Sequence, residues 1–304
     1  MSHAIIIPIY CENRNTINLC NELQNFGAEH IVVVNDGLNP KSEYFNELTS
    51  IGCHLVHLKN NNGKGASLKA GIKYAHDNLY NITGYITCDA DGQHTANDVM
   101  KISRMLDLRN GSLILGKRDY KKSKMPINIR IGNRLSSAYF KVITGKSCRD
   151  TQTGLRGIPA FLYDTVMKTK GSRFDFEMNF LTKCADMRVP FYFVNIIADC
   201  SNCSSNFRLI KDTYLIYRTP LRFATASIGC TIIDLVLFTI FAYILPSHMF
   251  FNIMLATLMA RVVSGGINFL INRKVIFGNT DNGAKQALRF FILFSISIRY
   301  SSGS

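Results

Sequence analysis

Two aspartates separated by one small residue are the clearest chemical signal in the sequence. Asp89 and Asp91 follow the apolar run Ile82–Cys88, and Gln93 comes two residues later. Two carboxylates in one turn can bind a divalent cation, to which Gln93 can add a neutral oxygen ligand. Such a cation would stabilise the charge that develops on a diphosphate leaving group. An ordinary acidic turn is the alternative interpretation.

Acids also follow two earlier apolar runs. Glu12 comes after residues 4–9, and Asp36 comes after residues 30–35. A carboxylate in such a place can accept a hydrogen bond from a nucleobase N–H or a ribose hydroxyl. We predict this contact for Asp36, with an Asx turn at Gly37 as the structural alternative. Glu12 also suits the first turn of a helix.

Basic residues exceed what a metal-bound diphosphate would need. Lys64, between two glycines, is predicted to lie beside the donor site, although the segment lacks the spacing of a P-loop and a flexible turn with a solvated lysine is the alternative. Further bases are Lys117, Arg118, Arg130, Arg134 and Arg156. This surplus predicts a second bound phosphate, for which solvated surface charge is the alternative at Lys117 and Arg134. An anionic phosphate oxygen can act as a nucleophile without a general base, whereas a hydroxyl ordinarily needs one.

The segment 150–156 is dense in hydrogen-bonding side chains, among them Gln152, and has neither a helical nor a strand pattern. It is predicted to be a loop that lines a polar pocket, with a solvated loop as the alternative. Residues 174–177 are expected to shape a binding site or to cap the next helix rather than to perform chemistry.

Alternating apolar and helical patterns must position these side chains. Strands are predicted at 4–9, 30–35, 53–58, 82–88, 112–116 and 191–197, and helices at 18–26, 42–49, 66–78, 96–108, 126–144, 159–167 and 176–186. This alternation predicts an α/β fold, a mostly parallel sheet with helices on both faces. Ligands bind beyond the carboxyl ends of such strands, which is where the acids fall.

Two long apolar stretches lie near the C-terminus. Residues 223–245 and 249–271 each exceed the ~20 residues that a spanning helix needs, so we predict a C-terminal transmembrane helical hairpin. Lys and Arg residues lie at both outer ends and not at 246–248, which predicts that those ends lie in the cytoplasm. Asp234 and Arg261 would reach a similar depth and are expected to form an ion pair. A third run, 290–298, is too short to span.

The charge balance indicates anionic partners. Lys and Arg number 35 against 21 Asp and Glu, a formal net charge of +14. The bases gather at 117–134 and before the apolar stretches, which favours phosphates and a membrane surface over nucleic acid. The nine cysteines form no paired framework, so a reducing compartment is expected.

These motifs together resemble family 2 glycosyltransferases of the dolichyl- or polyprenyl-phosphate sugar synthase type over residues 3–222. The matching segments are 8–12, 35–37, 63–65, 89–94, 116–118, 150–156 and 205–208. The resemblance implies a GT-A fold, inverting transfer and a metal ion at Asp89, Asp91 and Gln93. Residues 221–298 resemble a GtrA-like membrane domain, incomplete here. Cys11 stands where the family usually has Asn, and Asn35 where it usually has Asp.

The resemblance also assigns residues to two binding sites. It implies nucleotide contacts from Pro8, Tyr10, Glu12 and Asp36, and acceptor-phosphate contacts from Arg118, Arg134 and Arg208. With the residues inferred above, the nucleotide-sugar site also contains Lys64, Asp89, Ala90, Asp91 and Gln152, and the acceptor site also contains Arg130. Asp89, Asp91 and Arg118 are the expected catalytic residues.

The expected organisation is a cytoplasmic GT-A domain at 1–204, a basic juxtamembrane helical segment at 205–222, a GtrA-like membrane domain at 223–298 and a tail at 299–304. The expected protein is a multi-pass protein of the cytoplasmic membrane. It would use Mg²⁺ or Mn²⁺ to transfer a sugar from a nucleotide-diphosphate sugar, with a UDP-sugar favoured over GDP-mannose.

The expected acceptor is undecaprenyl or dolichyl phosphate, and the product would serve cell-envelope glycosylation. The lipid bilayer is a partner, nucleic acid is not, and a homo-oligomer is left open. Two alternatives remain at this stage. One is a glycosyltransferase for a sugar hydroxyl of a polysaccharide or glycolipid, and the other is a catalytically idle membrane scaffold or flippase partner.

Overall fold

The computed structural model describes residues 2–118, 127–197, 209–245 and 250–271. The chain forms two compact units, Met1–Leu215 and Ile216–Ser304. The first unit carries every predicted site residue that lies within the described ranges. The predicted third apolar run, 290–298, the tail at 299–304 and Arg208 lie outside them.

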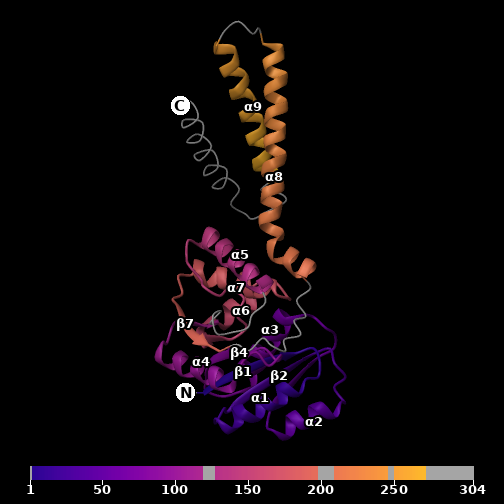
Figure 1. Cartoon of the computed structure of the whole chain (residues 1–304), viewed down its shortest axis with the longest axis vertical. Helices are drawn as coiled ribbons and strands as arrows, with labels where there is room; N and C mark the ends of the chain where they lie inside the picture. The colour runs from indigo at the N-terminus through magenta and orange to yellow at the C-terminus, as the bar shows by residue number, and fades with distance from the viewer. Residues whose placement is uncertain (1, 119–126, 198–208, 246–249, 272–304) are drawn as a thin grey trace. The chain divides into compact units, whose positions relative to one another are not determined.

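The first unit alternates strands and helices along the chain (Figure 1). Its elements are β1 (Ser2–Ile9), α1 (Arg14–Asn25), β2 (His30–Asp36), α2 (Glu43–Ser50), β3 (His54–Leu58), α3 (Lys64–Asn78), β4 (Ile82–Thr87), α4 (Ala96–Leu108), β5 (Leu113–Arg118), α5 (Ile127–Thr144), β6 (Arg156–Pro159), the 3₁₀ turn η1 (Ala160–Leu162), α6 (Tyr163–Lys168), α7 (Asp175–Asp186) and β7 (Phe191–Ile196). All six predicted strands and all seven predicted helices of this unit are present; α4 has the predicted bounds and the others have shifted ends.

The strands form one seven-stranded sheet in the order β3-β2-β1-β4-β6-β5-β7. The pairs β1/β2, β1/β4, β2/β3 and β5/β7 are parallel, as predicted. Strand β6 was not predicted; it runs antiparallel between β4 and β5, with Arg156 opposite Thr87 on one side and Leu115 on the other. Its four residues carry no period that identifies a strand. The segment forms a strand only because the two neighbouring strands supply its hydrogen bonds.

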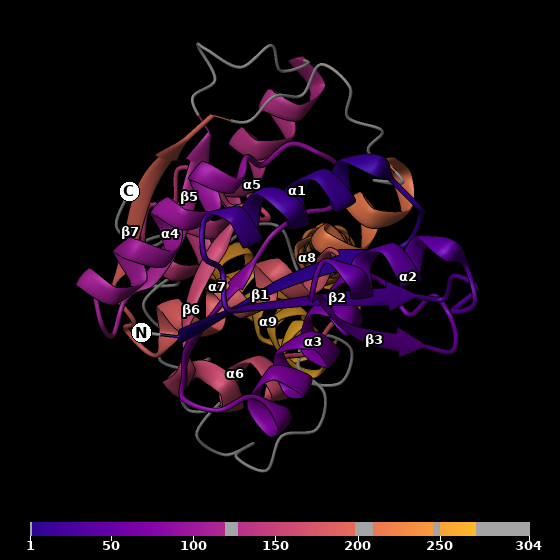
Figure 2. The same cartoon turned by 90° about the horizontal axis from the view of Figure 1, so that it is seen from below.

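Helices cover both faces of the sheet, as predicted (Figure 2). Successive residues of a strand point to opposite faces. Ile5, Ile7 and Ile9 of β1 therefore pack with α1, α2 and α4, whereas Ala4 and Ile6 pack with the core formed by α3, α5, α6 and α7. The sheet thus holds its strand ends rigidly between two apolar layers.

Local capping explains where the helices begin. Helix α1 begins at Arg14, before the predicted residue 18, because the Asn13 side chain accepts a hydrogen bond from the backbone N–H of Asn15 at 2.9 Å. The Thr95 hydroxyl likewise accepts from the Asp98 N–H and starts α4 directly after the segment 88–94. These caps set the length of the turn that contains the two aspartates.

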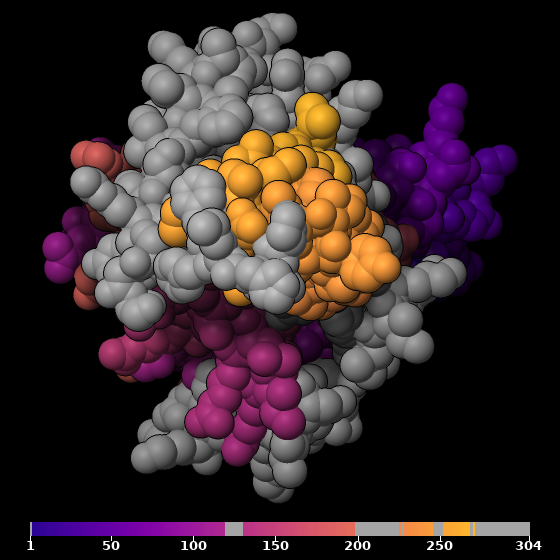
Figure 3. Space-filling model, turned by 90° about the horizontal axis from the view of Figure 1, so that it is seen from above, coloured from indigo at the N-terminus to yellow at the C-terminus, as the bar shows by residue number. Residues whose placement is uncertain are grey.

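The second unit contains a helix pair, α8 (Leu209–Ile244, which begins in the first unit) and α9 (Phe250–Ile271). Their described atoms lie against one another, orange and yellow in Figure 3. The buried positions among the described side chains of helix α9 are the small residues Ala256, Ala260, Ser264 and Gly265. Across the described residues, no helix reaches the length and apolarity expected of a membrane span.

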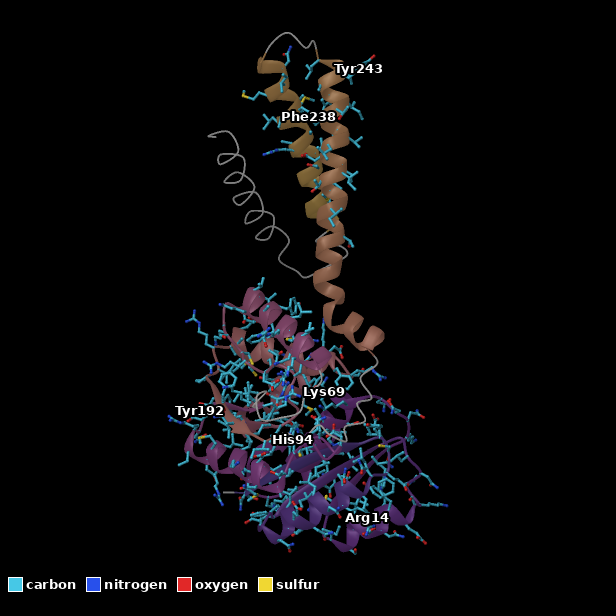
Figure 4. The ribbon with its side chains drawn as sticks, in the orientation of Figure 1. Arg14, Lys69, His94, Tyr192, Phe238 and Tyr243 are labelled. Atoms are coloured by element: carbon cyan, nitrogen blue, oxygen red, sulfur yellow. The ribbon has the colours of Figure 1, made fainter. Side chains whose placement is uncertain are left out.

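Asp234 of α8 has a different partner from the predicted one. It accepts a hydrogen bond from the Ser264 hydroxyl at 2.7 Å. Within the described part of these helices, no Arg261 nitrogen lies within 4.0 Å of an Asp234 oxygen, so the predicted ion pair is wrong. Asp234 and Arg261 instead line a shared cavity of about 220 Å³ together with Phe238, which is labelled in Figure 4.

Candidate active site

The two aspartates lie in a turn at the carboxyl end of the central strand β4. The Thr16 hydroxyl at the start of α1 donates to the Ala90 carbonyl at 3.1 Å. The Thr87 hydroxyl at the end of β4 donates to the Gly154 carbonyl at 2.8 Å. The turn is therefore held from one side by α1 and from the other by the segment 150–156.

Lys64 and Asp89 form the closest charged contact of the site. The ammonium of Lys64, the first residue of α3, lies 2.6 Å from Asp89 Oδ1. Buried His94, labelled in Figure 4, places Nε2 3.8 Å from Asp89 Oδ2, and neither of its ring nitrogens has a hydrogen-bond partner within the described residues. A Cβ at position 154 would fall 2.0 Å from Asp89 Oδ2, so this loop residue must be glycine.

A second carboxylate also holds Lys64, and it comes from the segment 174–177, which was predicted to shape a binding site or to cap the next helix. Glu177 Oε1 of α7 lies 3.1 Å from the Lys64 ammonium, and Glu177 is only 6 % exposed. The Arg156 guanidinium donates to the Glu177 carbonyl at 3.0 Å. In the sequence, Glu177 stands between the apolar residues Phe176 and Met178. An acid among buried helix residues needs a positively charged partner, and this position was the signal for such a contact.

Arg156 itself is a structural residue in this arrangement. It is 2 % exposed, and its guanidinium also donates to the carbonyls of Thr153 and Thr151. The interpretation of Arg156 as part of a phosphate-binding surplus is therefore wrong. Its three nitrogens instead hold the segment 150–156 together and join it to Glu177 of α7.

The pKa values of the two aspartates shift in opposite directions. Burial is the largest effect on Asp89 and disfavours its charged form, but the Lys64 ammonium and His94 together outweigh burial and lower the pKa of this carboxyl. Burial and the charge of Asp89 both raise the pKa of Asp91. Burial would lower the pKa of Lys64, yet Asp89 and Glu177 raise it, so Lys64 is charged at neutral pH. The site thus holds an ionised Asp89 beside a more basic Asp91.

The oxygen atoms of Asp89, Asp91 and Gln93 suit a divalent cation that also binds phosphate oxygens. Asp91 accepts hydrogen bonds from the backbone N–H and the side-chain amide of Gln93, which places all three predicted ligands in one turn. Within the described ranges, no group of three or more His, Cys, Asp and Glu side chains forms a complete metal cage. Carboxylate and amide oxygens are ligands that suit a hard divalent cation.

Tyr10 lies at the end of β1 close to these acids. Burial, Cys11 and the charges of Asp91 and Asp89 raise the pKa of Tyr10 to about 12, so its hydroxyl is neutral at physiological pH. Of the other predicted nucleotide residues on this segment, Pro8 is buried and Glu12 is exposed. Ala90 lies between the two aspartates and is partly buried.

Asp36 supports the loop that leads to Lys64. Its carboxylate accepts hydrogen bonds from the backbone N–H groups of Asn62 at 2.8 Å and Gly63 at 2.9 Å. Gly63 has a φ of +94°, a conformation that favours glycine. This contact differs from the Asx turn with Gly37 that was the structural alternative, and it links the end of β2 to the start of α3.

Asn35 makes contacts that an aspartate could not reproduce. Its side-chain amide donates to the Leu38 carbonyl at 2.9 Å and lies 3.0 Å from His57 Nδ1, while its oxygen accepts from the Leu38 N–H. Asn35 is 1 % exposed. A carboxylate has no hydrogen to donate to the Leu38 carbonyl, which gives the local reason for asparagine here.

The predicted acceptor residues fall into two environments. Arg118 at the end of β5 is 6 % exposed and forms a bidentate pair with buried Asp150, with Nε···Oδ2 2.7 Å and Nη2···Oδ1 2.8 Å. Arg130 and Arg134 lie one turn apart on α5, and both are exposed. The Thr151 hydroxyl donates to the Ser136 hydroxyl of the same helix at 2.9 Å, which joins α5 to the segment 150–156.

Gln152 lies along α5. A Cβ on Gly132 of that helix would come 3.9 Å from Gln152 Nε2, an ordinary van der Waals distance. Through the segment 150–156, Gln152 and the exposed bases of α5 are therefore connected to the turn of Asp89. Among the described residues of the first unit, the structure joins the elements that carry the predicted donor residues to the helix that carries Arg130 and Arg134.

The fold is shared with solved sugar-nucleotide enzymes. The glucosyl-3-phosphoglycerate synthase from Mycobacterium tuberculosis, solved in complex with Mn²⁺ and UDP-glucose, superposes with a TM-score of 0.53 at 12 % identity, covering 73 % of this chain and 77 % of that one. Another structure of that synthase, solved with phosphoglyceric acid, gives the same values. The mixed sheet with helices on both faces is therefore the GT-A-like fold of nucleotide-sugar transferases.

The chain belongs to the family Glycosyl transferase family 2, which it matches over residues 4–164, more than half of its length. Residues 222–303 match the family described as GtrA/DPMS, transmembrane domain. The predicted enzyme class and both family resemblances are confirmed. The protein is a glycosyltransferase that acts on nucleotide sugars.

Two archaeal relatives match the glycosyltransferase part. An uncharacterised protein of Methanocaldococcus jannaschii is 32 % identical over 188 residues, which cover 58 % of this chain and 73 % of that protein. The UDP-N-acetylglucosamine–dolichyl-phosphate N-acetylglucosaminyltransferase of Methanococcus voltae is 29 % identical over 172 residues, covering 50 % of this chain and 67 % of that enzyme.

Proposed function

We propose that this glycosyltransferase transfers a sugar from a UDP-sugar to a polyprenyl phosphate, with inversion at the anomeric carbon. The observation that carries the proposal is the acid pair Asp89 and Asp91, joined through the segment 150–156 to a helix that bears the exposed bases Arg130 and Arg134. One group suits a metal-bound diphosphate, and the other suits a second phosphate. The dolichyl-phosphate transferase of Methanococcus voltae supports this acceptor class and a UDP-linked donor.

The donor site is proposed to contain the residues around the two aspartates. Mg²⁺ or Mn²⁺ held by Asp89, Asp91 and Gln93 would supply Lewis-acid stabilisation of the leaving diphosphate. The nucleotide-sugar contacts are proposed for Pro8, Tyr10, Glu12, Asp36, Lys64, Ala90 and Gln152. The neutral Tyr10 hydroxyl can donate a hydrogen bond, and the Lys64 ammonium can lie beside the phosphates.

The acceptor site is proposed to contain Arg118, Arg130, Arg134 and Arg208. These bases would hold the phosphate of the lipid with one anionic oxygen directed at the anomeric carbon. A phosphate monoester carries about −1.5 to −2 charges at pH 7, so this oxygen needs no general base. Arg118 would act while paired to Asp150, which fixes the plane of its guanidinium.

The match to the GtrA/DPMS transmembrane domain supports a place at a bilayer, where such a lipid is found. We propose that residues 223–245 and 249–271 form the membrane hairpin of a multi-pass protein of the cytoplasmic membrane, with the glycosyltransferase domain on the cytoplasmic side. The basic segment 205–222 would then lie at the anionic membrane surface.

The test is a transfer assay on the full chain in detergent micelles. Undecaprenyl or dolichyl phosphate is mixed with radiolabelled UDP-GlcNAc, UDP-glucose or GDP-mannose and with Mn²⁺ or Mg²⁺, and label is measured in the lipid extract. The expected result is a lipid product from a UDP-sugar that disappears with EDTA and in Asp91→Ala. Asp77→Asn, which changes an exposed carboxylate on α3, serves as the matched control and should retain activity.

Label that enters only a polysaccharide or glycolipid hydroxyl would assign the alternative acceptor class. A lipid product that persists with EDTA and in Asp91→Ala would refute the proposed metal site. If none of the three donors gives a lipid product, the proposal that polyprenyl phosphate is the acceptor is refuted.

A further inference from the structure

Lys64 occupies the place beside Asp89 at which a cation would bind. Its ammonium lies 2.6 Å from Asp89 Oδ1 and 3.1 Å from Glu177 Oε1, so one buried positive charge bridges two carboxylates. The two acids belong to different parts of the chain, the turn after β4 and helix α7. Only Asp89 belongs to the proposed metal site, and Glu177 has no assigned part in it.

We propose that Lys64 fills the cation position at Asp89 until a divalent cation arrives with the donor diphosphate, and that Glu177 is the positioning residue that then retains Lys64 at the site. This inference rests on the proposed function. It makes the Lys64 ammonium an internal competitor of the metal ion. It also gives Glu177 a role in donor binding without any contact with the sugar.

Charge explains why the exchange needs a second carboxylate. A divalent cation and an ammonium repel one another strongly when both contact one carboxylate inside a protein. Because Lys64 is largely buried, it cannot simply move into water without losing its packing. Glu177 already lies within ion-pair distance, so the ammonium can keep one partner when Asp89 turns to the metal. It then remains positive beside the incoming phosphates.

The surrounding backbone holds Lys64 and Glu177 at a fixed separation. A Cβ on Gly65 would fall 2.5 Å from Phe176 Cβ, and a Cβ on Gly63 would fall 2.7 Å from Arg173 Cγ. The Ala66 N–H also donates to the Ser172 carbonyl at 2.9 Å. The glycines on either side of Lys64 therefore allow the start of α3 to pack directly on the start of α7.

Arg156 also holds Glu177. Its guanidinium bonds the Glu177 carbonyl and lies 3.9 Å from Glu177 Oε1. Glu177 is thus held between two positive groups, of which Arg156 is tied to the segment 150–156 and Lys64 alone contacts Asp89. When a metal ion takes Asp89, Lys64 is the charge that must adjust.

The test measures binding, not turnover. Mn²⁺ affinity of the full chain in detergent micelles is measured by titration calorimetry without nucleotide, and UDP affinity is measured at saturating Mn²⁺. In Lys64→Met, Mn²⁺ should bind roughly tenfold more tightly because the competing charge is gone, while UDP should bind several-fold more weakly. In Glu177→Gln, Mn²⁺ should bind roughly tenfold more weakly because the displaced ammonium loses its second partner.

Lys73→Met is the matched control, since it removes an exposed lysine of the same helix that pairs only with Asp77 among the described residues. It should leave both affinities unchanged. The opposite signs expected for Lys64→Met and Glu177→Gln separate the proposal from misfolding, which would weaken Mn²⁺ binding in both. A weaker or unchanged Mn²⁺ affinity in Lys64→Met would overturn it.

These measurements also separate the inference from the proposed function. Reciprocal changes in Mn²⁺ affinity with no lipid product would support the cation exchange and remove the proposed acceptor. Lipid transfer by the wild-type chain with no change of Mn²⁺ affinity in either variant would keep the proposed function and refute the exchange.

Discussion

Gly154 lies directly against the carboxylate of Asp89. A Cβ at position 154 would fall 2.0 Å from Asp89 Oδ2 and 2.4 Å from its carboxyl carbon. Any larger residue must therefore displace the proposed metal ligand or the loop that carries Gln152. The contact is between a loop and a strand end that are far apart in the sequence, and the proposed donor site depends on it.

Gly154→Ala should reduce kcat by about 100-fold or more, because a displacement of about 1 Å at a reacting group has effects of this size. Steady-state transfer assays with a saturating UDP-sugar and Mn²⁺ measure the change. Gly229→Ala is the control, since a Cβ there meets nothing within 4 Å. Wild-type kcat in Gly154→Ala would show that Asp89 need not keep its observed place.

Asp36→Asn should destabilise the protein even without nucleotide. The substitution removes one of the two oxygens that accept backbone N–H bonds from Asn62 and Gly63, at a cost of about 1–3 kcal/mol for a buried unsatisfied group. Urea unfolding of the nucleotide-free protein measures this loss. Asp77→Asn, at an exposed pair, should leave the unfolding midpoint unchanged.

If Asp36→Asn keeps its stability and loses only UDP affinity, the carboxylate serves the nucleotide alone. A loss of both would assign it both roles. The structure favours the second result, because both carboxylate oxygens already bond the loop before Lys64.

Arg134→Gln should raise the KM for polyprenyl phosphate by about tenfold, the effect of losing one charge-assisted contact, while the thermal midpoint stays constant. The reason is that Arg134 is exposed on α5, so its removal leaves no buried partner behind. Lys141→Gln removes another exposed base of that helix and is the control. An unchanged KM in Arg134→Gln would exclude this residue from the acceptor site.

Arg118→Gln should behave differently, because Arg118 neutralises a carboxylate that is fully buried. Loss of the guanidinium leaves Asp150 uncompensated, and breaking such a buried pair costs about 3–5 kcal/mol. Thermal and urea unfolding measure the loss. The double variant Arg118→Gln with Asp150→Asn should recover part of the stability, and failure to recover any would mean that the pair is not the source of the loss.

Stability should fall as the pH is lowered below about 6.5, in part because of His3, since an unfolded histidine titrates near that value. Burial lowers the pKa of His3 in the folded protein, although Asp107 lies 3.3 Å from its Nε2 and opposes the shift. The unfolded chain therefore binds the proton first, and the contribution of His3 is complete above that pH and lost below it. Urea unfolding at about pH 8 and pH 5 in wild type and His3→Gln measures it. An identical pH dependence in the variant would remove His3 as a cause.

Local patterns in the sequence predicted most elements of the first unit but not the antiparallel strand β6. Short continuous runs rich in Ile and Val identify β1 and β2, and the spacing of apolar residues identifies α3 and α4. The four residues Arg156–Pro159 have neither pattern, and they form a strand only because the edges of β4 and β5 lie open on both sides of them.

The candidate site also contains features that the sequence could predict and contacts that it could not. Asp89, Asp91 and Gln93 stand together in the sequence, so their proximity could be predicted, and Asp36 and Lys64 could be assigned to strand and helix ends. The ion pairs that set the charges of the buried residues could not be predicted from the sequence. Glu177 forms an ion pair with Lys64 across more than a hundred residues of chain, and Arg118 pairs with Asp150 from another segment.

The sequence by itself determined the type and order of the elements, the family, and the acids placed after β4, because periodicity, turns and short motifs depend only on neighbouring residues. The tertiary structure alone decided which carboxylate each buried base contacts, that Asp36 supports a loop, and that Gly154 must lack a side chain. The reason is physical: contacts between distant segments depend on how the helices pack on the sheet, and the free energy of a buried charge depends on the partner that packing brings to it.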